Sequence, residues 1–83
     1  MAAKTPSSVT PINVGGREGF VAVFADIDDA DTWASGLTAD PLGKYIDNTT
    51  DGTVISATVS SGIFTFTVAS SGTNKAATIL VIK

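Results

Sequence analysis

The chain has 83 residues, 16% of them charged, with a formal net charge of −3 and neither cysteine nor histidine. A chain of this length has room for one domain, which buries only roughly 60% of its unfolded surface, and the scattered Lys and Arg residues lack the clustering that nucleic-acid binding needs. Without cysteine or histidine, disulfides, thiolate chemistry and histidine-based catalysis are excluded, and any metal site would consist of oxygen ligands alone.

The first eleven residues are small and polar, and Pro6 and Pro11 interrupt them. This composition favours neither a helix nor regular strand pairing. We therefore predict that residues 1–11 form an extended arm or a flexible tail, and that residues 12–83 form a single β-rich domain. Such an arm either stays flexible or becomes ordered on a neighbouring molecule. The start of the chain lacks the apolar core of a signal peptide, so we expect an unprocessed, soluble protein.

Residues 12–14 favour a short edge strand, and a glycine-rich turn follows at residues 15–19. The turn leads into residues 20–25, which read as a strand. A phosphate-binding glycine loop opens a helix instead, so these glycines do not indicate a nucleotide site.

Residues 26–37 carry the only helical signal. Apolar residues recur at i, i+3, i+4 and i+7 from Ala30, Asp28 is placed to cap the first turn, and Gly36 can end the helix. The aspartates lack the glycine and glutamate positions of a calcium-binding loop. We predict a short helix that packs on the sheet through Trp33, because a helix of about two to three turns is marginal by itself.

After a loop, residues 44–47 favour a short strand and residues 47–52 a turn. Asn48 begins a glycosylation acceptor motif, which is more simply explained as part of this turn. Asp47 and Asp51 could also share a cation there.

Residues 54–60 and 63–69 alternate apolar and hydroxyl side chains, as paired strands with one buried face do. A two-residue turn between them would pair Val59 with Phe64, Ala57 with Phe66 and Ile55 with Val68. A three-residue loop would place polar residues against the phenylalanines, so the pattern itself predicts the register.

Residues 76–82 are apolar almost throughout, so both faces of this strand need cover. We expect a central strand covered by the helix on one side and a loop on the other. The alternative is that part of the strand lies against another subunit.

The predicted fold class is therefore α+β. It consists of a small antiparallel sheet of four or five strands with one short helix packed on it. The strands expected in this sheet are residues 20–25, 44–47, 54–60, 63–69 and 76–82.

The proline-broken arm, the run at residues 19–24, the helix signal at residues 26–36 and the hydroxyl-rich hairpins ending at residues 79–83 together resemble a known group of proteins. They are similar to small structural proteins from the virion gene clusters of tailed bacteriophages, in particular capsid cement or decoration proteins. The resemblance implies a protein that binds an assembled capsid lattice in many copies and reinforces it.

The sequence thus favours a non-enzymatic virion protein without cofactors, catalytic residues or a metal site. Expected partners are a lattice of the major capsid protein and further copies of the chain, as a trimer or a dimer, but neither nucleic acid nor a membrane. We expect it on the capsid exterior, and soluble in the host cytoplasm before assembly. The candidate partner-binding residues lie in the arm, on the last strand and beside it: Thr5, Pro6, Val9, Pro11, Ile12, Ile63, Leu80 and Ile82.

The alternative function is a small carbohydrate- or ligand-binding module, such as a domain of a host-recognition fibre. It would use Trp33, Tyr45 and nearby aspartates as an exposed stacking site. The position of Trp33 distinguishes the two hypotheses, because burial of this side chain favours the structural role.

Overall fold

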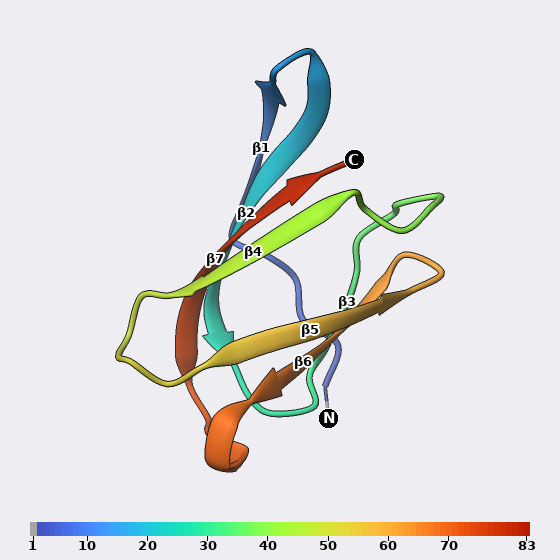
Figure 1. Ribbon diagram of the computed structural model, residues 1–83. Helices are drawn as coiled ribbons and strands as arrows, with labels where there is room; N and C mark the ends of the chain where they lie inside the picture. Colours follow the sequence, from blue (N-terminus) through green and yellow to red (C-terminus); the bar gives the residue numbers. More distant parts are fainter. Residues whose placement is uncertain (1) are drawn as a thin grey trace.

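Two antiparallel sheets make up the fold of the computed structural model, which describes residues 2–83 (Figure 1). The strand order is β1-β2-β7-β4 in the first sheet and β3-β6-β5 in the second. The elements are β1 (Ser8–Val14), β2 (Arg17–Ile27), β3 (Thr32–Ala34), β4 (Gly43–Asn48), β5 (Ile55–Ser60), β6 (Ile63–Val68), a short 3-10 turn (Ala69–Ser71) and β7 (Lys75–Ile82). The fold is therefore mainly β, and the predicted α+β class is wrong.

The core fills the space between the two sheets. Trp33 lies at its centre, with its ring 5.2 Å from that of Phe24 and 5.0 Å from that of Phe64, measured between centroids. Offset and edge-on aromatic pairs of this kind add to the stability gained by burying apolar area. The buried apolar residues are Phe20, Ala22, Phe24, Ile27, Trp33, Ile55, Phe64, Phe66, Val68, Ala77, Ile79 and Val81.

The register of the β5–β6 hairpin is the predicted one. Val59 pairs with Phe64, Ala57 with Phe66 and Ile55 with Val68. The two turn residues between the strands both have positive φ, 52° at Ser61 and 79° at Gly62, as the right-handed strand twist requires of a two-residue hairpin loop.

The helix predicted at residues 26–37 does not form. This segment contains the end of β2, a turn in which Ala30 has a φ of 69°, and β3. The aspartates accept hydrogen bonds from distant backbone N–H groups instead of capping a helix: Asp28 from Asn74, Asp29 from Val68 and Asp31 from Ala2. Because so short a helix gains little by itself, these bonds and strand pairing with β6 outweigh the helical pattern.

The last strand is central, as predicted, but the second sheet covers its inner face where a helix was expected. β7 lies between β2 and β4. Its residues Ala77, Ile79 and Val81 are buried in the core, whereas the residues between them are half-buried.

The segment predicted as an arm lies along strands of its own chain in this structure. Residues 2–4 run beside β3, where Thr32 donates its backbone N–H to the Ala2 carbonyl and accepts a hydrogen bond from the Lys4 N–H. We call residues 2–4 the N-terminal segment. From Ser8 onward the chain forms β1 and pairs with β2. Met1 lies outside the described residues.

Candidate interaction surface

The face of the four-stranded sheet that points away from the core carries a group of apolar side chains. Phe20, Ala22 and Phe24 of β2 point into the core, so the residues between them point to the opposite side. The pairing of β1, β2, β7 and β4 aligns these residues in rows across the sheet. We call the following set the outer face: Ile12, Val14, Val21, Val23, Tyr45, Leu80 and Ile82.

Two rows make up the middle of the outer face. In the first row, Thr10 pairs with Val21, Val21 with Leu80, and Leu80 with Tyr45. In the second, Ile82 lies between Gly19 and Gly43, which have no side chains to cover it. A Cβ on Gly19 would lie 3.4 Å from the Ile12 side chain and would collide with the Val81 carbonyl oxygen. Glycine there keeps this part of the face flat.

No layer formed by residues 2–83 covers the outer face, because the second sheet packs on the opposite side. Tyr45 is 63% exposed, Val14 48% and Val23 36%, and the other members are half-buried. Two charged side chains lie at its margin: Asp47 is exposed on the edge strand β4, in the row of Val23 and Thr78, and Arg17 donates a hydrogen bond of 2.9 Å to the Lys83 carbonyl. The face therefore offers apolar contact and little electrostatic attraction.

The structure brings three of the predicted partner-binding residues together on this face: Ile12, Leu80 and Ile82. Ile63 is 40% exposed, but it lies on β6 in the second sheet and not beside β7.

Four further candidates lie toward the N-terminus. Val9 and Pro11 are exposed on β1 on the side opposite to the outer face, and Thr5 and Pro6 lie between the N-terminal segment and β1.

Val14, Val21, Val23 and Tyr45 were not predicted as members of this surface. The run Phe20 to Ala25 is apolar at both odd and even positions. The same pattern in the last strand indicates that both faces of that strand need cover. Applied to residues 20–25, it could have placed Val21 and Val23 on a second apolar face.

The acidic residues near β3 hold the fold together. Asp31 is 1% exposed, and its carboxylate accepts hydrogen bonds from the N–H groups of Ala2, at 3.0 Å, and Asp28, at 2.8 Å. Its Oδ2 atom also lies 3.5 Å from the Lys4 Nζ atom. Asp31 therefore attaches the N-terminal segment to the turn that precedes β3.

Lys4 faces the same acidic group. Partial burial lowers the pKa of Lys4, but the nearby carboxylates of Asp26, Asp31 and Asp28 together raise it by more. The pKa of Lys4 therefore lies above its ordinary value. Since the aspartates are already used as acceptors, they form no ligand set: residues 2–83 contain no group of three acidic residues placed to hold a metal ion.

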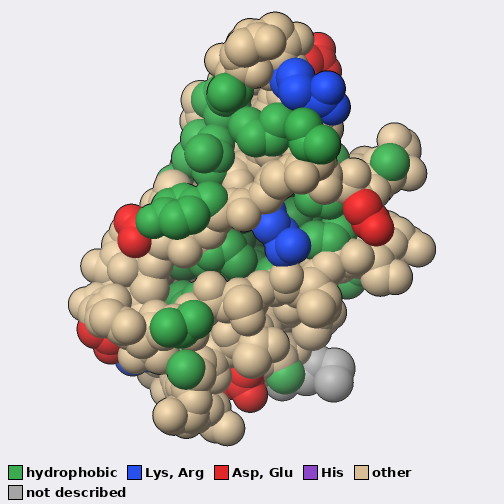
Figure 2. Space-filling view, viewed as in Figure 1, with side chains coloured by type: hydrophobic (Ala, Val, Ile, Leu, Met, Phe, Trp, Pro, Cys, Tyr) green, Lys and Arg blue, Asp and Glu red, His purple; other side chains and the backbone are tan. Residues whose placement is uncertain are grey.

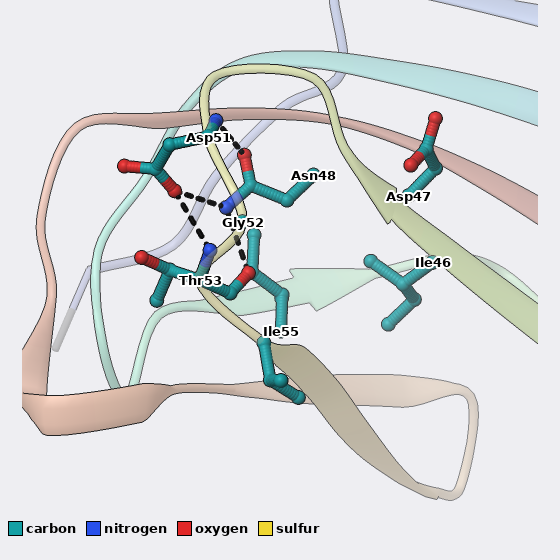
Figure 3. A pocket seen from close by; sticks show the side chains of 8 residues that line it. Ile46, Asp47, Asn48, Asp51, Gly52, Thr53 and Ile55 are labelled. Atoms are coloured by element: carbon teal, nitrogen blue, oxygen red, sulfur yellow. Dashed lines mark hydrogen bonds between the residues drawn. The ribbon is translucent and has the colours of Figure 1, made fainter.

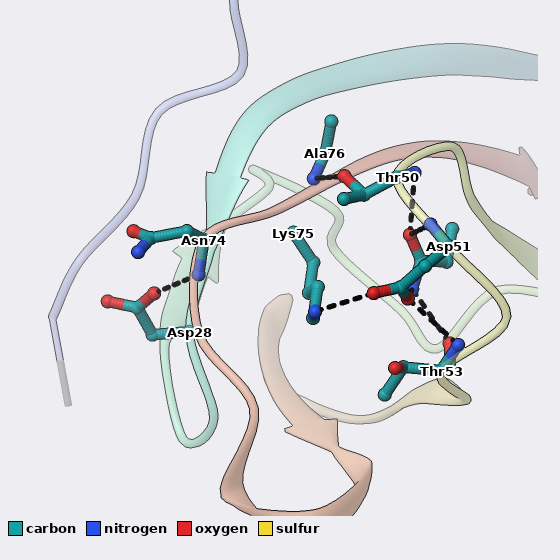
Figure 4. A network of polar contacts seen from close by, with 8 residues as sticks. Asp28, Thr50, Asp51, Thr53, Asn74, Lys75 and Ala76 are labelled. Atoms are coloured by element: carbon teal, nitrogen blue, oxygen red, sulfur yellow. Dashed lines mark hydrogen bonds and ion pairs between the residues drawn. The ribbon is translucent and has the colours of Figure 1, made fainter.

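The loop that joins β4 to β5 contains a second polar network (Figure 4). Asp51 Oδ2 lies 2.7 Å from Lys75 Nζ, and the Asp51 N–H and the Thr50 N–H both donate to Asn48 Oδ1. The hydrogen bond from Lys75, together with those from Thr53, holds the pKa of Asp51 well below its usual range. Asp51 is thus paired with an internal cation, the Lys75 ammonium group, and not with a metal ion shared with Asp47, which was the alternative that the sequence left open.

The stacking site of the alternative hypothesis is also not assembled. Trp33 is 6% exposed and is enclosed by Phe20, Phe24 and Phe64, whereas Tyr45 points outward from β4. A buried indole cannot stack on a sugar ring. No buried side-chain nitrogen or oxygen atom among the described residues lacks a hydrogen-bond partner, so none is left aimed at a polar ligand.

Comparisons with known proteins add no relative: no family model, no curated protein and no solved structure matches the chain. Within the described part of the chain, no helix is long and apolar enough to cross a membrane.

Proposed function

We propose that this protein is a non-enzymatic structural protein of a virion, which binds an assembled capsid lattice and stabilises it as a cement or decoration protein. The observation that supports the proposal is the outer face, an apolar sheet surface that no other part of residues 2–83 covers. Exposed apolar patches of this kind commonly mark contacts with other proteins. The burial of Trp33 favours this role over carbohydrate binding.

The outer face would bind by apolar contact, and its low charge means that electrostatic steering adds little. One small patch of this kind gives modest affinity, so several copies acting together would bind far more tightly. We therefore propose a homo-oligomer, a trimer or a dimer, that engages several lattice sites on the capsid exterior. Before assembly, the protein would be soluble in the host cytoplasm.

Point variants test this better than removal of residues 1–11, because that truncation would remove half of the edge strand β1. Tyr45→Lys and Val23→Lys place charge on exposed positions of the outer face. Thr58→Lys, on the exposed side of β5, is the matched control, since it adds the same charge to the other sheet.

Capsids purified with each variant, with subunit occupancy measured by mass spectrometry, provide the readout. We expect Tyr45→Lys and Val23→Lys to lower occupancy by about tenfold or more, equivalent to ~1.4 kcal/mol, and Thr58→Lys to leave it unchanged. Absence of the wild-type chain from purified virions would refute the proposed function. Equal occupancy of all variants would show that the outer face is not the contact.

A further inference from the structure

The contacts that hold the N-terminal segment in place are polar. The Thr32 N–H donates to the Ala2 carbonyl at 2.8 Å, the Thr32 carbonyl accepts the Lys4 N–H at 2.7 Å, and Asp31 accepts the Ala2 N–H. The side chains of Ala2 and Ala3 are exposed, and no residue of the segment belongs to the core. Detachment of the segment would therefore uncover no core residue.

The Asp31 carboxylate makes this place beside β3 specific. It is almost fully buried, and its partners are the N–H groups of Ala2 and Asp28 and the Lys4 ammonium group, 3.5 Å away. Without the segment, only the Asp28 N–H would remain. A buried carboxylate that loses its partners destabilises the fold, so the place needs an extended segment that presents a backbone N–H and, two residues later, a cation.

A short link joins the segment to β1. The Lys4 N–H bonds to β3 in the second sheet, and the Ser7 N–H bonds to the Val23 carbonyl of β2 in the first sheet. Packed sheets lie about 10 Å apart, and the stretch from Lys4 to Ser7 reaches at most about 10–11 Å when fully extended. The link thus crosses between the sheets with almost no slack, and Pro6, whose ring fixes φ, lies within it.

Figure 1 shows this course of the chain, from the start of β1 to the N-terminus beside the second sheet. Short hinges without slack favour exchange of the hinged segment between copies, because the same contacts then form between two chains without the constraint of the link.

The edge of β3 is the sheet edge that takes up this segment. β4 and β5, by contrast, face each other, and their Cα atoms come within 8 Å. The side chains of Ile46 and Ile55 point into the space between these two strands (Figure 3). A segment of a second copy would therefore dock on β3 and not between β4 and β5.

We infer that copies of this chain exchange their N-terminal segments, so that residues 2–4 of one copy pair with β3 and Asp31 of another. The contacts are the ones described above, made between two chains. Mutual exchange closes a dimer, and exchange around a ring closes a trimer. Each copy gives one segment and receives one, so every β3 edge and every Asp31 carboxylate keeps its partners.

The surface allows copies to approach each other in this way. The net charge is only −3, and Figure 2 shows charged side chains scattered over the visible face, without a large cluster of one sign. The outer face lies on the first sheet and β3 on the second, so an oligomer joined by this exchange leaves the outer face uncovered.

This inference deepens the proposed function, because it supplies the contact between copies that the proposed homo-oligomer needs, and it rests on that function only for the role of the oligomer. The exchange itself is tested in the free protein. Exchange without incorporation into virions would remove the proposed function and leave the inference. Incorporation of a chain that stays monomeric would do the reverse.

Introduced cysteines test the exchange, because the chain has none of its own. Ala3 and Thr32 lie opposite each other in the parallel bridge between the segment and β3, within the reach of a disulfide. One chain carries Ala3→Cys and a second chain carries Thr32→Cys, and both are produced in the same cells, purified and oxidised. Neither chain can form an internal disulfide, so a link between the two thiols requires that the segment of one copy lie beside β3 of the other.

The control pairs Ala3→Cys with Thr67→Cys, a position exposed on the same face of the second sheet as Thr32. Mass spectrometry of the linked peptides should find the Ala3→Cys and Thr32→Cys chains joined about tenfold more often than the control chains, equivalent to ~1.4 kcal/mol. Equal yields would overturn the inference, since random collision would explain both.

A longer link provides the second test. In the double variant Ala3→Cys/Thr32→Cys, oxidation should join separate copies. Insertion of several glycine and serine residues after Thr5 gives the link slack, so the same double variant should then form a disulfide within each chain. Internal disulfides with both link lengths would overturn the inference.

Sedimentation of the chain without introduced cysteines decides the matter independently. We expect a dimer or a trimer that becomes a monomer when the link is lengthened. A monomer at every concentration, or an oligomer that the longer link leaves unchanged, would refute the exchange.

Discussion

The clearest test of the fold is the replacement of Phe66 by alanine. Phe66 is 0% exposed, and its ring centroid lies 5.5 Å from that of Phe24 in the other sheet and 6.4 Å from that of Phe64. Phe66→Ala therefore removes contacts that join the two sheets and leaves a cavity between them. Such substitutions cost about 3–5 kcal/mol. A domain of this size is stable by roughly 4–12 kcal/mol, so the variant should lose a large fraction of its stability.

Urea unfolding monitored by fluorescence measures this loss directly, because Trp33 is the only tryptophan. Thr67→Val is the matched control: Thr67 is the next residue in β6, is exposed and points to the other face. The control keeps a β-branched side chain and should change stability by no more than about 0.5 kcal/mol. A loss within 0.5 kcal/mol for Phe66→Ala, or a larger loss for the control, would mean that the buried face of β6 has been assigned the wrong way round.

Three further predictions concern the turns and polar contacts. Gly62→Ala should destabilise the chain by at least about 1 kcal/mol, because Gly62 has a φ of +79° and a Cβ there would approach the Leu37 carbonyl oxygen; an unchanged melting temperature would contradict this. Asp31→Ala should cost about 1–3 kcal/mol by leaving the partly buried N–H groups of Ala2 and Asp28 without their acceptor, and it should speed hydrogen exchange in the N-terminal segment; slow exchange there would show that Asp31 does not hold it. Because the Lys75 hydrogen bond lowers the pKa of Asp51, its stabilising effect should be present above the unfolded-state pKa of about 4 and lost as the pH falls below it. The difference in melting temperature between wild type and Asp51→Asn should therefore be larger at neutral pH than in strong acid, and a constant difference would contradict this explanation.

The sequence alone was sufficient for the β5–β6 hairpin. Alternating side chains set which face is buried, and the two-residue turn allows only one pairing that puts Phe64 and Phe66 opposite apolar residues. Both signals are local, since they depend on residues that are neighbours in the chain or lie directly across the turn. The apolar character of the last strand likewise predicted its central position.

The aspartate-rich segment depended on distant partners. The backbone N–H groups that donate to its aspartates lie far away in the sequence. The donor is 46 positions from Asp28, 39 from Asp29 and 29 from Asp31. A helical pattern describes only what a segment gains by itself. It could not anticipate that these bonds and pairing with β6 would stabilise an extended conformation at Trp33.

The candidate surfaces were also decided by the tertiary structure. The outer face joins side chains from β1, β2, β7 and β4, and it exists only because the last strand, β7, pairs between β2 and β4. Sequence shows which residues need cover, as it did for Leu80 and Ile82. Which of them stay uncovered depends on which face of the first sheet the second sheet packs against. The packing of Trp33, Phe64 and Phe66 on β2 and β7 decides this. Such a contact between distant parts of the chain is not determined by any local pattern.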